Sequence, residues 1–274
     1  MDSILRIDAP SSEDIASFHR DGYIAFSDVL TDAGREGLID EVVNYGPVGE
    51  FLRISEEERG KLDPQYRYSV RPWNDRGPWS DSLIDAPLVT NLLKSTIGPD
   101  YHFCHSAMNL ASRGAKKVGF HQDHHHWRHS NPVNLAEREK YYIQLLYYPN
   151  GFKAGDRSLS VIPGSHLVSP TEEVTPERLL AGEFNDQLGR ELELKGLEMP
   201  PGSMVYINAR MFHGVDAKPV DSPQEYRIFT IDIFKEAGPP HRHTQEIPAK
   251  WMEKASPYRK RLFEREAYSP ECWK

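Results

Sequence analysis

The amino-acid sequence predicts a mainly β protein, an antiparallel sandwich or barrel with flanking helices. The main observation is a series of short apolar runs separated by Gly, Pro, Asn and Asp, which is typical of antiparallel strands joined by turns. A second observation is helical spacing of apolar residues, with capping residues, in the part of the chain before position 98. The strand-like runs are 101–110, 118–123, 141–148, 159–162, 192–198, 203–208 and 226–234.

The length of the chain and the absence of a linker-like segment favour one domain. It has 274 residues, of which 38% are hydrophobic, and it contains no internal repeat or low-complexity linker. We therefore expect a single domain over residues 1–274. Its β core should span about residues 100–235, with N-terminal helices within 11–98 and a helical tail over 249–274.

Charge and cysteine content exclude several classes of function. A net charge of -8 argues against nucleic-acid binding, and no apolar run is long enough to span a membrane. The N-terminus lacks the pattern of a signal peptide, and two cysteines, Cys104 and Cys272, cannot form a disulfide framework. We expect a soluble cytoplasmic protein with a small-molecule substrate. Its oligomeric state is left open.

Three helix starts are indicated by capping residues. Ser11 is followed three positions later by Asp14, a capping-box pattern, and Thr31 precedes a second segment with helical spacing. Asp85 is the expected cap of a third helix, which Gly98 should end.

The remaining segments outside the β core are less regular. Residues 23–26 have strand character, and residues 47–80 combine weak periodicity with four prolines, so we expect a long structured loop there. Residues 249–266 mix charged and apolar side chains, which predicts one surface helix.

The stretch 119–127 contains the strongest site signal. His121 and Asp123 are two residues apart, so on a strand both side chains point to the same face. His213 is the candidate for a third ligand. Two histidines and one carboxylate suit ferrous iron in oxygenases and leave coordination positions open. Taken alone, however, the His-x-Asp pattern recurs by chance, and a lone histidine such as His213 is more often structural.

Arg227 lies in the last strand-like run, where a buried arginine needs an anion. One candidate partner is the nearby carboxylate of Asp232. The other is the distal carboxylate of a keto-acid cosubstrate, which a guanidinium group binds through two parallel hydrogen bonds.

Several motifs, in this order along the chain, give a more specific signal than any one alone. Through them the chain resembles the phytanoyl-CoA dioxygenase family of iron(II)/2-oxoglutarate oxygenases, over roughly residues 10 to 235. The motifs are Asp21-Gly22-Tyr23-Ile24, Phe120-His121-Gln122-Asp123, Leu159-Ser160-Val161-Ile162-Pro163-Gly164-Ser165-His166, Pro201-Gly202-Ser203-Met204-Val205, His213-Gly214 and Arg227.

The resemblance implies a double-stranded β-helix, which is a cupin-like jelly roll. It also implies iron(II) on His121, Asp123 and His213, 2-oxoglutarate held by Arg227, and O2 as the oxidant. The expected reaction is hydroxylation of a small metabolite or natural product, with formation of succinate and CO2. Desaturation, ring formation or epoxidation would need the same triad. Two alternatives remain: a catalytically silent binding or regulatory relative, and a cupin-like metal enzyme that does not use 2-oxoglutarate.

Two further residues are expected to help bind the cosubstrate, 2-oxoglutarate. Gln144 is the one polar residue of an apolar strand, which favours a position in the cavity. Asn109 or Ala111 occupies the region where many family members carry a lysine that helps to hold 2-oxoglutarate. We expect Gln144 and Asn109 to contribute to cosubstrate binding.

Three aromatic residues are candidates for the substrate wall. Trp127 matches a tryptophan that lines the cavity of the related ectoine hydroxylases, although it could equally be an ordinary core residue. Phe229 is two residues past Arg227 and should share its inward face, and Tyr142 lies on the same strand as Gln144. The sequence does not identify the substrate itself.

Overall fold

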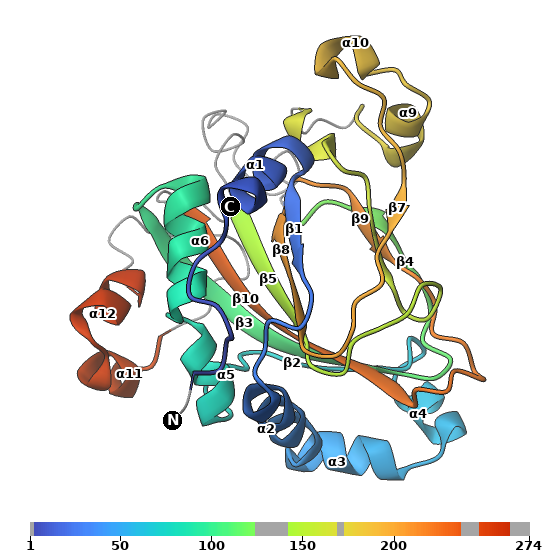
Figure 1. The fold of residues 1–274 in the computed structure, drawn as a ribbon. Helices are drawn as coiled ribbons and strands as arrows, with labels where there is room; N and C mark the ends of the chain where they lie inside the picture. The colour runs from blue at the N-terminus through green and yellow to red at the C-terminus, as the bar shows by residue number, and fades with distance from the viewer. Residues whose placement is uncertain (1–2, 124–141, 169–172, 237–246, 264–274) are drawn as a thin grey trace, which may run out of the picture.

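Two antiparallel sheets form the centre of the molecule, shown in Figure 1. The computed structural model describes residues 3–123, 142–168, 173–236 and 247–263. Within these ranges the six-stranded sheet has the order β1-β8-β5-β10-β3-β2 and the four-stranded sheet the order β4-β9-β6-β7. The strands are β1 Tyr23–Phe26, β2 Arg67–Val70, β3 Tyr101–Ser112, β4 Val118–His121, β5 Tyr142–Tyr148, β6 Leu159–Val161, β7 Lys195–Gly196, β8 Ser203–Asn208, β9 His213–Val215 and β10 Tyr226–Glu236.

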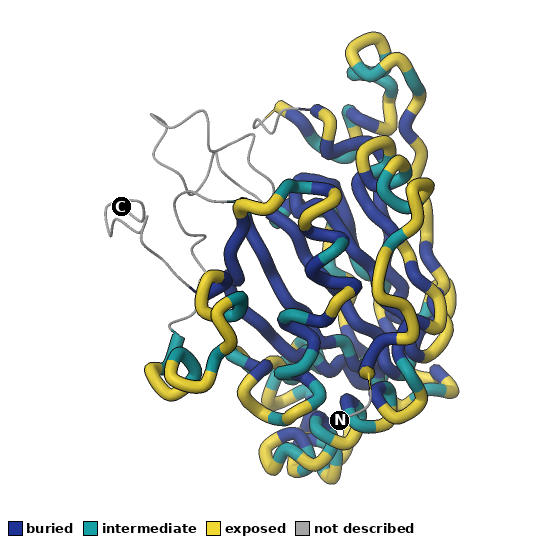
Figure 2. The backbone as a smooth tube through the Cα atoms, turned by 60° about the vertical axis from the view of Figure 1, so that its left-hand side comes forward, coloured by how far each residue is buried: buried dark blue, intermediate teal, exposed yellow. Residues whose placement is uncertain are grey.

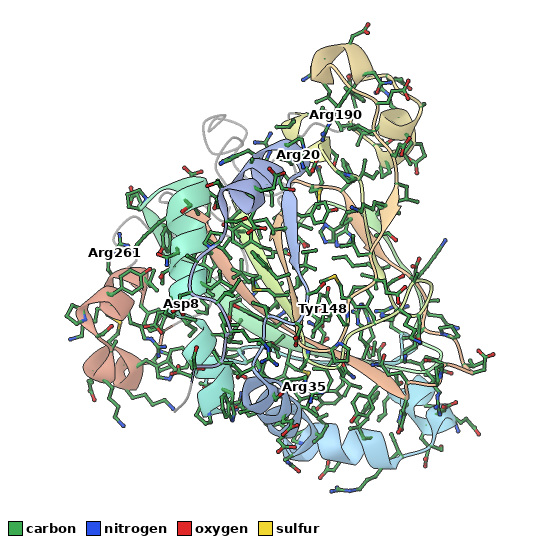
Figure 3. The ribbon with its side chains drawn as sticks, in the orientation of Figure 1. Asp8, Arg20, Arg35, Tyr148, Arg190 and Arg261 are labelled. Carbon is green, nitrogen blue, oxygen red and sulfur yellow. The ribbon has the colours of Figure 1, made fainter. Side chains whose placement is uncertain are left out.

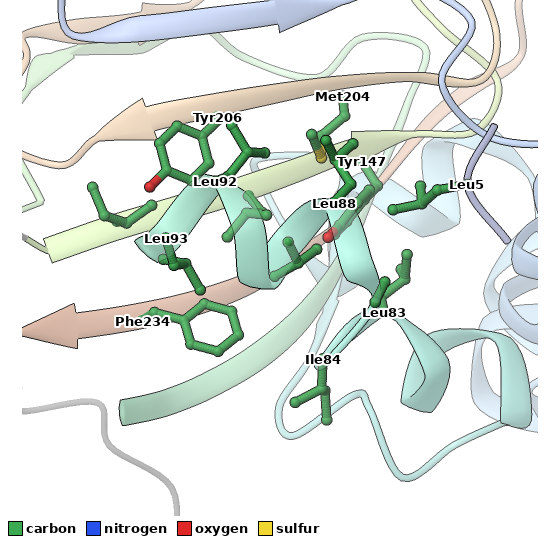
Figure 4. Packing of buried hydrophobic residues seen from close by; sticks show 14 of the residues in the cluster. Leu5, Leu83, Ile84, Leu88, Leu92, Leu93, Tyr147, Met204, Tyr206 and Phe234 are labelled. Atoms are coloured by element: carbon green, nitrogen blue, oxygen red, sulfur yellow. The ribbon is translucent and has the colours of Figure 1, made fainter. Parts of the chain in front are cut away.

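Strand β5 is buried along its whole length because both faces of the six-stranded sheet are covered. On one face Tyr147 packs in a core cluster with helix α6 (Pro87–Ile97), which also contains Leu88 and Leu92. Figure 4 shows this packing, and Figure 2 shows that the buried part of the backbone lies at the centre of the molecule. Tyr148, the next residue, belongs to a second cluster on the inner face. The alternation of side chains along the strand therefore separates a packed outer face from an inner face that can hold a site.

The N-terminal helices begin largely where their caps predict. The side chain of Ser11 caps α1 (Ser12–Asp21) in a capping box with Asp14, and Thr31 caps α2 (Asp32–Val43). The assignment of Asp85 as a cap is wrong, because α6 follows Ala86 without a side-chain cap. Asp85 instead accepts hydrogen bonds from Arg259. Gly98 does end α6, as expected.

The prediction of a long loop over residues 47–80 is wrong. This segment contains most of α3 and then regular elements of four to seven residues, listed below. Its prolines were misleading, because Pro47 and Pro78 occupy the first turn of a helix, where a missing N–H costs no hydrogen bond. Ser55 caps α4 in a capping box with Glu58. The elements are α3 Gly46–Arg53, α4 Glu56–Leu62, β2 Arg67–Val70 and α5 Pro78–Leu83.

Elements after β6 also differ from the expectation. Two short helices, α9 (Pro176–Leu180) and α10 (Asn185–Leu188), precede β7, which keeps only two residues of the expected run 192–198. The C-terminal segment forms α11 (Ala249–Lys254) and α12 (Pro257–Phe263) rather than one surface helix. Its apolar residues belong to the core, since the ring of Phe263 packs edge-on against that of Phe103. No helix in the described ranges is long and apolar enough to cross a bilayer.

Candidate metal centre

His121, Asp123 and His213 converge at one end of the four-stranded sheet. Their ligand atoms all lie within 4.8 Å of one another. His121 ends β4 and His213 begins β9, and the two residues are direct partners in the antiparallel pair. Asp123 lies two residues after the end of β4, and its N–H donates to the carbonyl of Ala209 at 3.0 Å. Strand pairing thus brings together His121 and His213, which are 92 positions apart in the sequence.

Backbone carbonyls orient both imidazole rings. Nδ1 of His121 lies 2.8 Å from the carbonyl oxygen of Gly119, and Nδ1 of His213 lies 3.0 Å from that of Met211. These contacts place a ring proton on Nδ1 and turn Nε2 of each ring toward Asp123, with Nε2 of His121 3.8 Å from Oδ1 and Nε2 of His213 3.3 Å from Oδ2. Metal-bound histidines are commonly oriented in this way. The donor set, two imidazoles and one carboxylate, fits iron(II).

Gln144 also holds the carboxylate of Asp123. Nε2 of Gln144 donates to Oδ2 of Asp123 at 2.5 Å. Burial opposes ionisation of Asp123, but hydrogen bonding and attraction from His213, together with His121 and Gln144, hold the pKa of this carboxyl well below its usual range. The pKa of His213 is raised, because the hydrogen bond to Asp123 outweighs burial. Asp123 is therefore an anion poised for a cation.

A cavity of about 230 Å³ opens beside these three residues. Its walls come from the inner faces of both sheets, and Tyr148, which contributes to this wall, is labelled in Figure 3. The cavity brings together every site residue expected from the sequence except Trp127, which lies outside the described residues. Those that line it are Asn109, His121, Asp123, Tyr142, Gln144, His213, Arg227 and Phe229.

Arg227 is buried in this wall and is 1% exposed. Its Nη1 donates to the carbonyl of Arg157, and its guanidinium carbon lies 5.1 Å from the ring centre of Phe229 and 5.4 Å from that of Tyr148. Burial lowers the pKa of Arg227. Its Nε is buried without a hydrogen-bond partner. The aromatic rings therefore surround a cation that lacks an anion within the described residues.

The alternative pairing of Arg227 with Asp232 is excluded by the strand geometry. The two residues are five positions apart on β10, so their side chains project from opposite faces. Asp232 lies on the outer face, near Tyr147 and Asp81, and burial raises its pKa to about 8.

The remaining predicted residues occupy distinct places in the cavity wall. Oδ1 of Asn109 accepts a hydrogen bond from Oγ of Ser69 at 2.6 Å. The hydroxyl of Tyr142 lies 3.3 Å from Nε2 of His105. Gln144, which we expect to contribute to cosubstrate binding, donates its amide N–H to the Asp123 carboxylate.

Sequence reasoning missed three arginines and one histidine that line the cavity: Arg67, Arg71, His105 and Arg157. Arg67 begins β2 and Arg71 follows its end, and both fall in the segment expected to be a loop, so no strand face was predicted there. His105 lies within the predicted strand 101–110, and its even spacing from Asn109 and Ala111 was a usable signal. Arg157 lies in the insertion before β6, where no local pattern indicates the direction of a side chain.

Fold and site together define a cupin-like jelly roll in which His121, Asp123 and His213 form a candidate mononuclear metal centre. The chain belongs to the phytanoyl-CoA dioxygenase (PhyH) family, whose model matches residues 18–228. This match includes Arg227 and all three residues of the candidate centre. A search among curated protein sequences gave no match.

Solved structures confirm the fold class. EctD from S. alaskensis, crystallised with 2-oxoglutarate and 5-hydroxyectoine, is 18% identical, with a TM-score of 0.62 over 99% of this chain and 89% of that chain. SnoN, described as a non-heme alpha-ketoglutarate-dependent epimerase from nogalamycin biosynthesis, is 14% identical, with a TM-score of 0.61 over 82% and 80%. SnoK, a carbocyclase of the same biosynthesis, is 16% identical, with a TM-score of 0.58 over 84% and 85%. At these identities the likeness concerns the fold.

Proposed function

We propose that this protein is an iron(II)/2-oxoglutarate-dependent dioxygenase that hydroxylates a small metabolite or natural product, forming succinate and CO2. One observation carries the proposal. A single cavity contains a His-Asp-His cluster on one wall and, on another, a buried arginine without a carboxylate partner. Membership of the PhyH family and the iron and 2-oxoglutarate named for the EctD structures support it.

His121, Asp123 and His213 would hold the iron, which supplies the binding of 2-oxoglutarate and the activation of O2. The backbone carbonyls of Gly119 and Met211 keep both imidazoles in the tautomer that can bind metal. Gln144 keeps the Asp123 carboxylate in one orientation.

Arg227 would bind the distal carboxylate of 2-oxoglutarate. A guanidinium group presents parallel N–H donors that match the two carboxylate oxygens, and its Nε is without a partner. The rings of Tyr148 and Phe229 exclude water around it, which strengthens the interaction. Asn109 lies on β3 opposite Phe229 and is a second candidate contact.

The substrate would approach the metal through the remainder of the cavity. Tyr142 and Phe229 line it and are proposed to contact the substrate, as is Trp127, which lies outside the described residues. Hydroxylation is the proposed outcome, because it is the simplest oxidation of a C–H bond at such a centre. The epimerase and carbocyclase among the similar structures show that this fold also hosts other reactions.

Formation of succinate tests the proposal against its alternatives. Iron-loaded protein incubated with 2-oxoglutarate and O2 should form succinate, and a panel of candidate substrates should accelerate it. Asp123→Ala should abolish succinate formation, while Asp221→Ala, at an exposed position, should not. Succinate formation retained in the Asp123 variant would remove this residue from the ligand set. Iron binding without any 2-oxoglutarate binding would favour the silent relative or the other metal enzyme.

A further inference from the structure

The cavity wall carries more positive charge than 2-oxoglutarate accounts for. Arg67, Arg71, Arg157 and Arg227 all line it, and Asp123 is the sole carboxylate among its described lining residues. None of the four arginines has an ion pair with a carboxylate in the described part of the chain. Cations gathered in this way cost free energy unless an anion joins them.

Two of these arginines face each other across a gap. Arg67 on β2 and Arg227 on β10 both pair with Ala111 on β3, so the three residues form one row across the sheet and project from the same face. Two strand spacings separate the ends of the row by about 10 Å. Because the side chain of Ala111, which lies between the two arginines on the sheet, is only a methyl group, it does not fill the space between the two guanidinium groups.

Arg157, in the turn before β6 of the other sheet, lines the same cavity. It adopts a φ of 57°, a left-handed conformation that is unfavourable for a residue with a side chain. Its side chain is nevertheless buried, at 3% exposure, and its Nη1 donates to the carbonyls of Lys116 and Asp216. Its Nε, like that of Arg67, is buried without a hydrogen-bond partner. Strain and unpaired buried donors at one point are typical of a ligand clamp.

The charges of the loaded metal centre are neutralised by Arg227 alone, without the other three arginines. The proposed cosubstrate is a dianion, and an iron(II) ion with the Asp123 carboxylate has one net positive charge. Arg227 supplies the second, so the loaded centre with Arg227 is neutral. Arg67 and Arg157 then still face the cavity, with Arg71 exposed beside them.

We propose that the substrate carries an anionic group, a carboxylate or a phosphate, which Arg67 and Arg157 bind across Ala111 from the cosubstrate arginine. The inference rests on the proposed function and adds the substrate class. The anion would be bound at a fixed distance from the metal, which leaves the apolar part of the substrate against Phe229 and Tyr142.

Anion binding to the loaded centre tests this directly. Zinc-loaded protein, saturated with 2-oxoglutarate, is titrated calorimetrically with sodium sulfate, or with sodium acetate, at constant ionic strength. We expect one anion per chain, with sulfate tighter if the natural group is a phosphate and acetate tighter if it is a carboxylate. Arg67→Gln should weaken binding at least about tenfold. The matched control is Arg35→Gln, on α2 at the periphery (Figure 3).

The same variants measure cosubstrate binding, which separates the two proposals. Arg67→Gln should leave the affinity for 2-oxoglutarate within about twofold, whereas Arg227→Gln should lower it at least about tenfold. If Arg67→Gln weakens 2-oxoglutarate as much as Arg227→Gln does, the extra arginines serve the cosubstrate and the inference is wrong. Absence of an anion site in protein that binds 2-oxoglutarate normally also overturns it and leaves the proposed function intact. Failure of 2-oxoglutarate to bind wild-type protein would contradict the proposed function instead.

Arg157→Gly offers a variant that does not strain the backbone. Glycine accepts a φ of 57° readily, so the turn before β6 should keep its conformation while the guanidinium group is removed. We expect a loss of anion affinity similar to that of Arg67→Gln. Unchanged anion affinity in a folded Arg157→Gly protein would show that Arg157 only fastens the segments at Lys116 and Asp216.

Discussion

At the residue scale, the position of Gln144 could be predicted from the sequence, but its hydrogen-bond partner could not. As the one polar residue in an otherwise apolar strand, it was expected in the cavity, and the structure places it there. Its partner could not be foreseen, because the contact with Asp123 depends on how β5 faces the segment after β4. Sequence reasoning could therefore identify the residue that faces inward but not the atom to which its amide donates.

Removal of the Gln144 amide should weaken metal binding. In Gln144→Leu the Asp123 carboxylate loses a hydrogen bond that orients it, so we expect the affinity for iron(II) or zinc(II) to fall about 10- to 100-fold. Metal titration against a competing chelator measures this. Gln187→Leu, at an exposed position, is the control. Equal affinity in the two variants would show that Gln144 does not position the ligand.

Arg227 should matter for the cosubstrate and not for the metal. Arg227→Ala removes a buried cation from the cavity, and we expect the binding free energy of 2-oxoglutarate to weaken by about 2–5 kcal/mol. Metal affinity should be unchanged, because Arg227 is not one of the clustered ligands. Calorimetry on metal-loaded protein gives both values. Wild-type affinity for 2-oxoglutarate in Arg227→Ala would remove this residue from the cosubstrate site.

Asp232 should make folding stability depend on pH. Burial, with repulsion from Asp81, raises its folded pKa to about 8, whereas an unfolded aspartate has a pKa of about 3.9. Between about pH 4 and 8 the folded state therefore retains a proton that the unfolded state has released. The contribution of Asp232 to stability falls as pH rises through this window, by up to about 1.4 kcal/mol per pH unit.

Asp232→Asn should remove that dependence. Urea unfolding at several pH values between 5 and 8 should show a smaller decrease in unfolding free energy than in the wild type, and a higher value at pH 8. Asp221→Asn, on the surface, should keep the wild-type slope. Parallel slopes in wild type and Asp232→Asn would mean that Asp232 is ionised in the folded protein.

At the scale of elements, prediction succeeded where a periodic pattern of apolar residues is bounded by clear turn residues. The strands β3, β5, β8 and β10 and the helix α6 have long apolar patterns bounded by turn residues, and all appear near their expected limits. Short elements were missed: β9 has only three residues, and α3, α4 and α5 lie among prolines. A pattern needs several repeats before a period is visible, so elements of one or two turns depend on tertiary packing.

Helix α6 should be an important support of the outer sheet face. Leu92 is fully buried in the cluster that joins α6 to the six-stranded sheet. Leu92→Ala should lower the free energy of unfolding by about 2–5 kcal/mol, because it leaves a cavity that the core cannot close fully. Denaturant unfolding measures the change, with Leu62→Ala as control, since Leu62 is 71% exposed. Similar losses in both variants would contradict the assigned packing.

At the scale of the whole molecule, the jelly roll gathers residues from distant parts of the chain. The family resemblance predicted the triad and Arg227 as one site, and the structure brings them to one cavity. The row of Arg67, Ala111 and Arg227 could not be predicted, because the register between strands depends on side-chain packing across the whole sheet. Sequence motifs thus indicate the metal centre, while strand register determines what surrounds it.

The most direct test of the central claim is an anaerobic titration of iron-loaded protein with 2-oxoglutarate. Binding of the keto acid to ferrous iron produces a weak visible absorption band. We predict that the band appears in the wild type, is lost in His213→Ala, and requires higher 2-oxoglutarate concentrations in Arg227→Ala. Absence of the band in wild-type protein that demonstrably holds iron would contradict the assignment of this cavity as an iron(II)/2-oxoglutarate site.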